Sequence, residues 1–494
     1  MADSDKEEQH KNTASAVSTP LENDTAAEKR LVRKTDLLMM PGLALAYFTH
    51  TLDRANLGNA KTDGFEKDLG LVGNQFSLLL VLFYVPYALF NIPWSILAKK
   101  YNSARVIPLA ILGWGACTMG AAGAKNFAGI MTTRIFMGAI EAACMCNNYP
   151  YSFALLPLTT SQIRDKPCEV YYLSLFYTRK EMAFRVSWIG QMGFIAGAVS
   201  GLISWGVFQW KGTLKGWQYL FLIEGSITVI VAIYLYIFAP QSPEKSRWYT
   251  EEEVKLAKYR LEQDSQDQDR AFRWEDAKKQ LKHWPTWAFA FMALMYGVGV
   301  ASSSNFLPTM IKRLTSKATT ANLYTVGPNL TASVFQVTVC WLSDRYQQRA
   351  TFACGTTVIS LTAWILLGTL DLVHQPQVGY FLTYLITFAT FIPSNLVPAW
   401  LSSNTPNTTG RAVSLGLNYM AMNLAGIISS LIYRAEDAPV YRPALITVGC
   451  TQGVFIITAL AMRQYYASLN RKLDSGELAC APGMEARPEY RYAV

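Results

Sequence analysis

The chain has 494 residues, of which 51% are hydrophobic and only 16% are charged. Soluble domains carry about 25% charged residues, so this composition excludes an ordinary soluble enzyme and indicates a protein that crosses a membrane several times. The net charge of +9 is not a nucleic-acid signal, because the basic residues fall in loops between apolar stretches.

The polar N-terminus and the cysteines exclude further classes. Residues 1–36 are rich in Ser, Thr, Glu and Lys and are expected to be disordered and cytoplasmic. They lack the apolar core of a signal peptide, so the first apolar segment is expected to serve as insertion signal and permanent helix. The eight cysteines are scattered, without the paired spacing of a zinc or disulfide framework. We expect the protein to bind no metal and no cofactor. We also do not expect it to be an enzyme, since neither a P-loop nor a nucleophile–base constellation is present.

Twelve apolar segments have close to the ~20 residues that a bilayer requires. They predict an all-α polytopic membrane protein with 12 transmembrane helices in two six-helix halves, residues 37–240 and 284–466. A charged cytoplasmic linker (241–283) joins the halves, and a cytoplasmic tail (467–494) follows them. Within the linker, Thr250 and Glu253 predict a capping box. The expected spans are 37–56, 76–97, 105–122, 128–146, 184–208, 218–238, 285–304, 321–342, 351–370, 378–398, 412–433 and 443–463.

The loops predict an orientation. With the N-terminus inside, cytoplasmic segments hold about 30 of the 44 basic residues, and this asymmetry places both termini in the cytoplasm. The sequons at Asn23 and Asn407 would then lie inside and carry no glycan, whereas Asn329 lies near or within a span, where glycosylation is doubtful.

Span four carries two charges in an apolar run. Arg134 and Glu141 are seven residues apart, about two turns, so they project from one face of a helix. Each costs about 2.5–3.5 kcal/mol at mid-membrane. They form either a structural ion pair or a substrate and proton site that lines a polar cavity, and the rest of the chain favours the second reading.

Span one ends with Asp53 and Arg54, which are adjacent and therefore about 100° apart around a helix. One is expected to face the cavity while the other anchors a neighbouring helix. In span six, Glu224 is expected to be a structural partner in the bundle. In span ten, Asn395 lies near two prolines, so it binds substrate or satisfies backbone groups freed by the kink, and the residues leave both readings open.

The two halves repeat one feature. Span two ends with Lys99 and Lys100, and span eight ends with Asp344 and Arg345, followed by Arg349. Two six-helix halves with matching charged loops resemble the major facilitator superfamily, in which these loops act as gates. The first copy has Lys99 where the second has Asp344, so its contacts are expected to differ, and charges that only set topology are the simpler alternative.

Longer motifs resemble a narrower family. Residues 53–60 (Asp-Arg-Ala-Asn-Leu-Gly-Asn-Ala), 171–174 (Tyr-Tyr-Leu-Ser), 216–225 (Gly-Trp-Gln-Tyr-Leu-Phe-Leu-Ile-Glu-Gly) and 400–404 (Trp-Leu-Ser-Ser-Asn) resemble the fungal allantoate permease family. This family belongs to the anion:cation symporter group of the superfamily. The resemblance implies uptake of small organic anions such as allantoate, nicotinate or pantothenate.

The same resemblance implies roles for individual residues. It assigns anion binding to Arg54 or Arg134 and proton coupling to Glu141, with Asp53 as a further proton-coupling candidate. The chemistry agrees, because a carboxylate needs a cation in a low-dielectric cavity and a carboxyl group beside an arginine can gain and lose a proton.

The resemblance breaks directly after Glu141. The segment at about 144–168 makes the number of residues between this glutamate and the Tyr-Tyr motif much larger than in the family. It contains three prolines and no helical period. The surplus is either a real loop or a translated intron, since Cys144-Met145-Cys146 can be encoded by a sequence that contains a fungal splice donor.

These features predict a monomeric transporter of the plasma membrane that takes up a small organic anion with protons by alternating access. One alternative is an exporter of an acidic metabolite, which a flanking biosynthetic gene cluster would favour. Another is a non-transporting nutrient receptor, which a long tail rich in motifs would favour.

Overall fold

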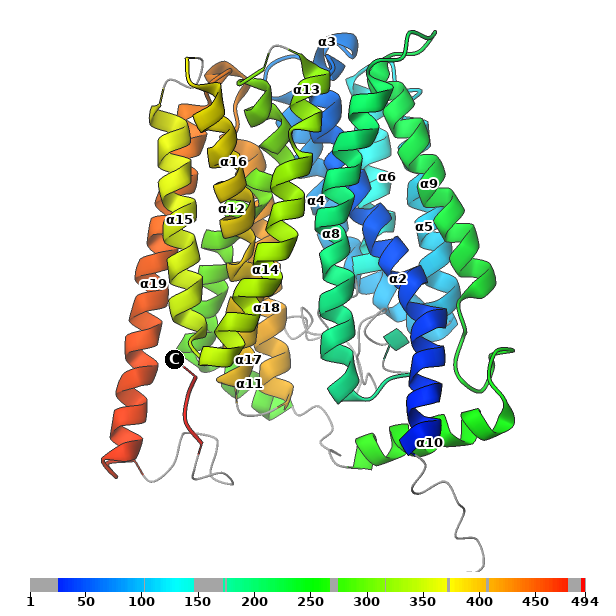
Figure 1. The fold of residues 1–494 in the computed structure, drawn as a ribbon, viewed down its shortest axis with the longest axis vertical. Coiled ribbons are helices and arrows are strands. Elements are labelled where there is room, and N and C mark those ends of the chain that lie inside the picture. The colour runs from blue at the N-terminus through cyan, green and yellow to red at the C-terminus, as the bar shows by residue number, and fades with distance from the viewer. Residues whose placement is uncertain are drawn as a thin grey trace, which may run out of the picture.

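The computed structural model describes residues 25–101, 103–145, 172–173, 176–266, 274–315, 317–370, 374–405, 408–478 and 490–493. Within these ranges the chain is helical and contains no β-strand (Figure 1).

The helices of the first half are α2 (Thr25–Thr62), α3 (Phe65–Asp68), α4 (Gln75–Tyr101), α5 (Ser103–Ala121), α6 (Phe127–Met145), α8 (Arg179–Val207) and α9 (Gly216–Phe238). The linker holds α10 (Glu251–Gln266) and α11 (Trp274–Lys282). The second half contains α12 (Trp284–Lys312), α13 (Ala318–Leu323), α14 (Val326–Tyr346), α15 (Arg349–Thr369), α16 (Pro376–Phe391), α17 (Pro393–Ser403), α18 (Thr408–Ile432), the short 3₁₀ helix η2 (Ala435–Asp437) and α19 (Arg442–Asp474).

Each of the twelve expected spans coincides with a helix, and the tenth coincides with the pair α16 and α17. Proline has no N–H to donate, and Pro393 begins α17 where α16 ends. Eight helical stretches among the described residues are long and apolar enough to cross a membrane. Others, such as α14 with Asn329, Ser333 and Gln336, are more polar because they face neighbouring helices.

The N-terminal segment differs from the expectation of disorder. Residues 25–36 form the first turns of α2. Leu31 is 2% exposed and packs with Leu256 and Ala257 of α10, so the linker supplies an apolar surface that makes these polar turns helical. The capping box is confirmed: Thr250 N donates to Glu253 Oε2 at 2.9 Å, and Glu253 N donates to Thr250 Oγ1 at 3.3 Å.

Figure 1 shows two groups of helices side by side, one containing α2 to α9 and the other α12 to α19. They meet where α2 contacts α12, where α4 contacts α18, and where α8 contacts α13 and α14. At the end of the bundle that carries α3 and α13 (the α13 end) these contacts are close. Asn322 Nδ2 donates to Thr62 Oγ1 at 3.0 Å, and Ser77 Oγ donates to the Tyr433 carbonyl at 2.9 Å.

Small and cationic side chains complete this closure. A Cβ atom on Gly58 would lie only 2.8 Å from the Asn305 carbonyl oxygen, so the glycine lets α2 and α12 touch. Lys61 Nζ lies 4.1 Å from the centroid of the Phe76 ring and 5.7 Å from that of Phe306. The side chain of Lys312 donates to the carbonyl of Thr62, at the C-terminus of α2. The two groups are therefore held together at the α13 end.

At the opposite end, which carries α10 and α11 (the linker end), polar contacts stay within one group. Arg260 of α10 pairs with Glu28 at 2.7 Å and with Glu181 at 2.6 Å, while Lys34 pairs with Glu253 at 2.7 Å. We call these three pairs the linker latch. Among the described residues, no ion pair or hydrogen bond at this end joins the two groups. Among the described residues, the polar contacts between the two groups therefore lie at the α13 end and at mid-depth, where Ser333 Oγ of α14 donates to Gln191 Oε1 of α8 at 3.1 Å.

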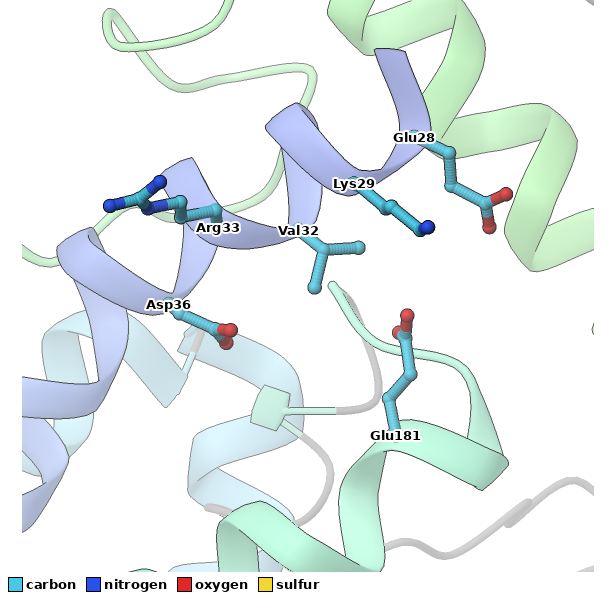
Figure 2. A pocket seen from close by; sticks show the side chains of 6 residues that line it. All are labelled: Glu28, Lys29, Val32, Arg33, Asp36 and Glu181. Atoms are coloured by element: carbon cyan, nitrogen blue, oxygen red, sulfur yellow. The ribbon is translucent and has the colours of Figure 1, made fainter. Parts of the chain in front are cut away.

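A cavity of about 510 Å³ lies beside the linker latch, and Figure 2 shows the side chains that line it. It is lined by Glu28, Lys29, Val32, Arg33, Asp36 and Glu181. Its three carboxylates already have arginine partners: Arg260 pairs with Glu28 and Glu181, and Arg185 pairs with Asp36 at 2.6 Å. We therefore treat the cavity as part of the latch rather than as a binding site.

The C-terminal residues 490–493 return to the second group. Asn404 exchanges two hydrogen bonds with Ala493, at 2.9 and 2.7 Å, and Asn470 exchanges two with Tyr492, both at 2.9 Å. The Tyr492 ring stacks on Tyr466 at 5.1 Å. This segment therefore ties the end of α17 to the last turns of α19.

Two sequence predictions meet the limits of the described residues. Most of the segment at about 144–168 lies outside them, as do the sequons at Asn23 and Asn407. Asn329 lies inside α14, where its Nδ2 donates to the Thr325 carbonyl at 2.9 Å and its side chain lies against Gly197 of α8. A glycan does not fit at this helix contact.

Candidate functional site

Three polar side chains meet midway along α2 and α6. Glu141 Oε1 lies 2.9 Å from His50 Nε2 and accepts a hydrogen bond from Arg54 Nε at 3.2 Å. His50 and Arg54 are four residues apart and so project from one face of α2. The side chain of Glu141 is only 1% exposed, whereas that of Arg54 is 27% exposed. We call His50, Arg54 and Glu141 the central cluster.

Aromatic rings of α4 surround the arginine of this cluster. The guanidinium carbon of Arg54 lies 5.0 Å from the centroid of Tyr87, 5.5 Å from Phe83 and 5.9 Å from Tyr84. Tyr84 in turn lies against Gly426 of α18, in the other group of helices. Cation–π contacts hold the guanidinium without consuming its N–H groups. Arg54 is therefore oriented at the boundary between the two groups.

The central cluster leaves polar atoms unsatisfied. Nδ1 and Nε2 of His50, Nη2 of Arg54 and Oε2 of Glu141 are buried without a hydrogen-bond partner among the described residues. Although His50 Nε2 is close to Glu141, the pair is not aligned as a hydrogen bond. Buried polar atoms without partners are rare in folded proteins. Four of them in one cluster can receive an anion, a proton or water.

Asp53 turns away from the central cluster, as its 100° offset from Arg54 predicts. It is 1% exposed and receives long contacts of 3.4 Å from Asn56 Nδ2 and from Thr228 Oγ1 of α9. Arg54 thus faces the boundary between the groups, and Asp53 anchors α2 to α9. No ion pair of Asp53 is found within the described ranges.

Arg134 does not contact Glu141. Seven residues place the two side chains on one face of α6, but also about 10 Å apart along its axis. Arg134 is 6% exposed, and its Nη1 lies 3.6 Å from Met137 Sδ. It interacts with Glu141 and Asp53 through its charge and not through contact. The pairing suggested by the sequence is therefore replaced by contacts of Glu141 with α2.

The expected gating residues of the second half lie at the linker end. Arg349 Nη2 is 3.4 Å from Asp344 Oδ1, and Nη1 donates to the Ala399 carbonyl at 2.5 Å and to the Ser403 hydroxyl. The guanidinium of Arg345 lies over the Trp341 ring at 5.6 Å. Arg349 therefore links the start of α15 to α17. Lys99 and Lys100 lie in the last turn of α4, and their side chains are outside the described part of the chain.

Asparagines of the second half divide into two kinds. Asn395, in the first turn of α17, is exposed. Asn418 is fully buried, where its Nδ2 donates to the Phe289 carbonyl of α12 at 2.9 Å, whereas Asn423 is exposed. The sequence also suggests that Asn418 and Asn423 line one side of this helix, but they do not, because five residues turn a helix by about 140°. Asn418 is a packing residue.

His50 is the member of the central cluster that the sequence reading missed. A lone histidine in an apolar helix is usually a core residue, so its type alone carried no signal. Its spacing did carry one: His50 precedes Arg54 by one turn and so shares its face, and the chain has only four histidines.

Two packed groups of membrane-length helices with charged side chains buried between them define a multi-pass membrane transporter. A sequence profile described as the Major Facilitator Superfamily matches residues 43–160 and 166–430. The chain belongs to this superfamily.

Fungal relatives are similar over most of the chain. The MFS-type transporter efuF of Hormonema carpetanum is 37% identical, over 92% of this chain and 88% of its own length. The Major facilitator-type transporter hxnP of Emericella nidulans is 34% identical, over 95% and 94%. The High-affinity nicotinic acid transporter of Saccharomyces cerevisiae is 30% identical, over 85% and 74%.

Solved structures share the fold at low identity. A D-xylose-proton symporter matches with a TM-score of 0.65 and 13% identity, over 86% of this chain and 97% of its own. The xylose transporter XylE from E. coli in its inward open conformation matches with a TM-score of 0.63 and 12% identity, over 86% and 94%.

Proposed function

We propose that this transporter takes up a small organic carboxylate together with protons by alternating access. The observation that carries the proposal is the central cluster, in which a half-accessible arginine and a buried glutamate share one contact and leave polar atoms unsatisfied. The distribution of the basic residues favours an orientation in which the linker end faces the cytoplasm. We place the protein in the plasma membrane. In that orientation the α13 end, where the two groups of helices touch, faces outward.

Competition for Arg54 couples the two substrates in this scheme. When Glu141 is ionised it occupies the guanidinium of Arg54. When Glu141 takes up a proton its negative charge disappears, and Arg54 can bind a substrate carboxylate through Nε and the free Nη2. Loss of the proton to the cytoplasm restores the pair with Glu141 and expels the anion. Arg134 and Asp53 supply the surrounding charge, and Asn395 of α17 is available to the substrate from the other half.

Gating belongs to the loops at the linker end. We assign Lys99, Lys100, Asp344, Arg345 and Arg349 to contacts that form and break as the cytoplasmic side closes. The contact of Arg349 with Ser403 supports this assignment, because it joins two helices whose linker ends must move for closure. The nicotinic acid transporter of yeast among the relatives makes nicotinate the first carboxylate to test.

The test is uptake of labelled nicotinate and a panel of small carboxylates by yeast that lacks its own carriers, at two external pH values. The chain is expressed as given and without residues 144–168. We expect uptake that rises at acid pH, and Glu141→Gln is expected to abolish this pH dependence. The control is Glu436→Gln, which changes an exposed glutamate at the α13 end. Unchanged pH dependence in Glu141→Gln would refute the coupling role, and outward movement of every carboxylate would refute uptake.

A further inference from the structure

A second buried carboxyl group lies outside the central cluster, on α9. Glu224 is fully buried. Its Oε1 accepts a hydrogen bond from Ser200 Oγ of α8 at 2.9 Å, and its Oε2 has no partner. Among the described residues, no lysine, arginine or histidine lies within ion-pair distance of it. The sequence analysis expected Glu224 to be a structural partner in the bundle, and its hydrogen bond with Ser200 does join α9 to α8.

The helices packed on α9 offer Glu224 no positive charge. From α2 it faces Asp53, whose negative charge opposes ionisation of Glu224. From α8 it faces the Ser200 hydroxyl, and α5 packs beside it through Gly115 and Met119, which contact Gly225. The cations of α2 are engaged elsewhere, Arg54 with Glu141 and Lys61 with Glu66. A buried carboxylate with one neutral donor is unfavourable, because its charge is taken out of water without a cation beside it, and protonation removes that charge.

Hydrogen bonds connect this carboxyl group to the closed end of the molecule. Asn59 Nδ2 donates to Ser200 Oγ at 2.7 Å, and Thr62 Oγ1 donates to the Asn59 carbonyl at 2.6 Å. The Thr62 hydroxyl receives the hydrogen bond of Asn322, which belongs to the other half. The residue after Ser200 is Gly201, which lies directly against Asn322 and Thr325. Ser200 and Glu224 therefore lie immediately behind the contact that closes the α13 end.

The two carboxyl groups lie at different depths. Glu224 is eight residues from the start of α9, about 12 Å from the α13 end, whereas Glu141 is fourteen residues from the start of α6, about 21 Å away. Opening of the α13 end separates Gly201 from Asn322 and admits water to Ser200 and Glu224. Closure removes that water again.

We propose that Glu224 is a second proton-binding group, whose protonation permits the α13 end to close. In the open state, Glu224 Oε2 takes a proton from water on that side, and closure then buries a neutral acid. The reverse step returns the proton to the same side when the end opens. The inference extends the proposed proton coupling, but it concerns closure of the carrier and requires no knowledge of the substrate.

The test uses purified full-length protein in liposomes without substrate. Spin labels are attached to Val72→Cys and Arg434→Cys in a background without the native cysteines. These two exposed positions lie in different halves at the α13 end, next to the hydrogen bond from Ala435 N to Asn74 Oδ1. Pulsed dipolar spectroscopy then measures the distance between them as the pH rises. We expect the wild type to shift from the closed to the open distance, and Glu224→Gln, which stays neutral, to remain closed.

Two further measurements make the outcome decisive. Infrared spectroscopy should show a carboxylic-acid C=O band at neutral pH that is absent in Glu224→Gln and present in Glu141→Gln. Ser200→Ala should shift this band without removing it, because Oε1 loses its only donor. Identical spectra of wild type and Glu224→Gln, or the same pH-dependent distance shift in both, would overturn the proposal. A pH-independent uptake would instead refute the proposed function and leave these spectra unaffected.

Discussion

Arg54 and Arg134 differ in what surrounds them. Arg54 is partly exposed, framed by rings and paired with Glu141. Arg134 is buried, and no carboxylate lies within ion-pair distance of it in the described ranges. Removing a full positive charge from water is costly, so the burial of a guanidinium is tolerated only if charge nearby compensates for it. Arg134 therefore contributes to the electrostatic potential around Asp53 and Glu141, whereas we propose Arg54 as the residue that meets a ligand.

His50→Gln tests whether the imidazole takes part in coupling. The glutamine keeps a polar side chain near Glu141 but cannot take up and release a proton as an imidazole can. We expect uptake at acid pH to fall about tenfold, about 1.4 kcal/mol, and its pH dependence to flatten. Initial rates of uptake over a range of external pH measure both effects.

The matched control is His374→Gln, which changes an exposed histidine outside the helices. It should leave rate and pH profile as in the wild type. If His50→Gln retains the full profile, the imidazole serves only to fill space between α2 and α6.

Single-residue chemistry was partly readable from the sequence. A charge in an apolar run is conspicuous, so Arg54, Arg134 and Glu141 were found, and the offset between Asp53 and Arg54 followed from helix geometry. Which side chains touch was not readable, because the partner of Glu141 comes from a helix more than eighty residues away. In the same way, whether Glu224 has a cationic partner depends on the side chains that α2, α5 and α8 place beside it.

At the scale of elements, the linker latch fixes α10 to the start of α2. Arg260 is 9% exposed and holds both Glu28 and Glu181. We expect Arg260→Ala to lower the free energy of unfolding by about 1–2 kcal/mol, less than for a fully buried pair, because Glu28 is half exposed and screened by solvent. Thermal unfolding of the protein in detergent measures the loss.

Lys258→Ala is the control for this latch variant. Lys258, on the same helix as Arg260, pairs with Glu244 of the preceding loop at 2.7 Å, but both side chains are about half exposed. Such a solvent-exposed pair contributes little to stability, so the melting temperature should hardly change. Equal losses of stability in the two variants would show that the ion pairs of Arg260 stabilise the fold no more than an exposed pair does.

The latch also has a defined pH dependence. Partial burial acts to raise the pKa of Glu253, but hydrogen bonds from Lys34 and from the Thr250 N–H outweigh it and leave the pKa below its usual value. A carboxyl group with a lowered pKa stabilises the fold above its unfolded-state pKa, and this contribution is lost as the pH falls through the lowered value. The latch is accordingly weakest in acid.

Elements were the easiest scale to predict, because apolar length alone identifies a span. The structure of the two ends of the chain was harder to predict. The first turns of α2 are polar and become helical only against Leu256 and Ala257 of the linker. Residues 490–493 carry no pattern of their own, and their position follows from the side-chain amides of Asn404 and Asn470.

At the scale of the whole molecule, closure of the α13 end depends on close helix approach at Gly58. We expect Gly58→Val to disfavour this closure by about 1–3 kcal/mol, since the backbone oxygen of Asn305 cannot move aside as a side chain would. The spin-label pair at residues 72 and 434 should then report a larger share of the open distance.

Gly206→Val is the matched control, because a Cβ atom on Gly206 meets nothing within 4 Å. It lies near the same end, in α8, and should leave the distance distribution unchanged. A closed distribution in Gly58→Val would mean that the two halves can close without this contact. The sequence marked small residues in this region, but which glycine touches the other half depends on the relative position of the halves.

The docked segment Tyr490–Ala493 has a practical consequence for producing this protein. Membrane transporters are commonly followed through expression and purification by a fluorescent protein fused to the carboxyl terminus. A fusion joined directly behind this segment lies next to Ala493, whose backbone is held by Asn404 and Trp400. A bulky domain there strains the tie between α17 and α19, whereas a tag placed ahead of residue 25 is joined to a segment remote from it.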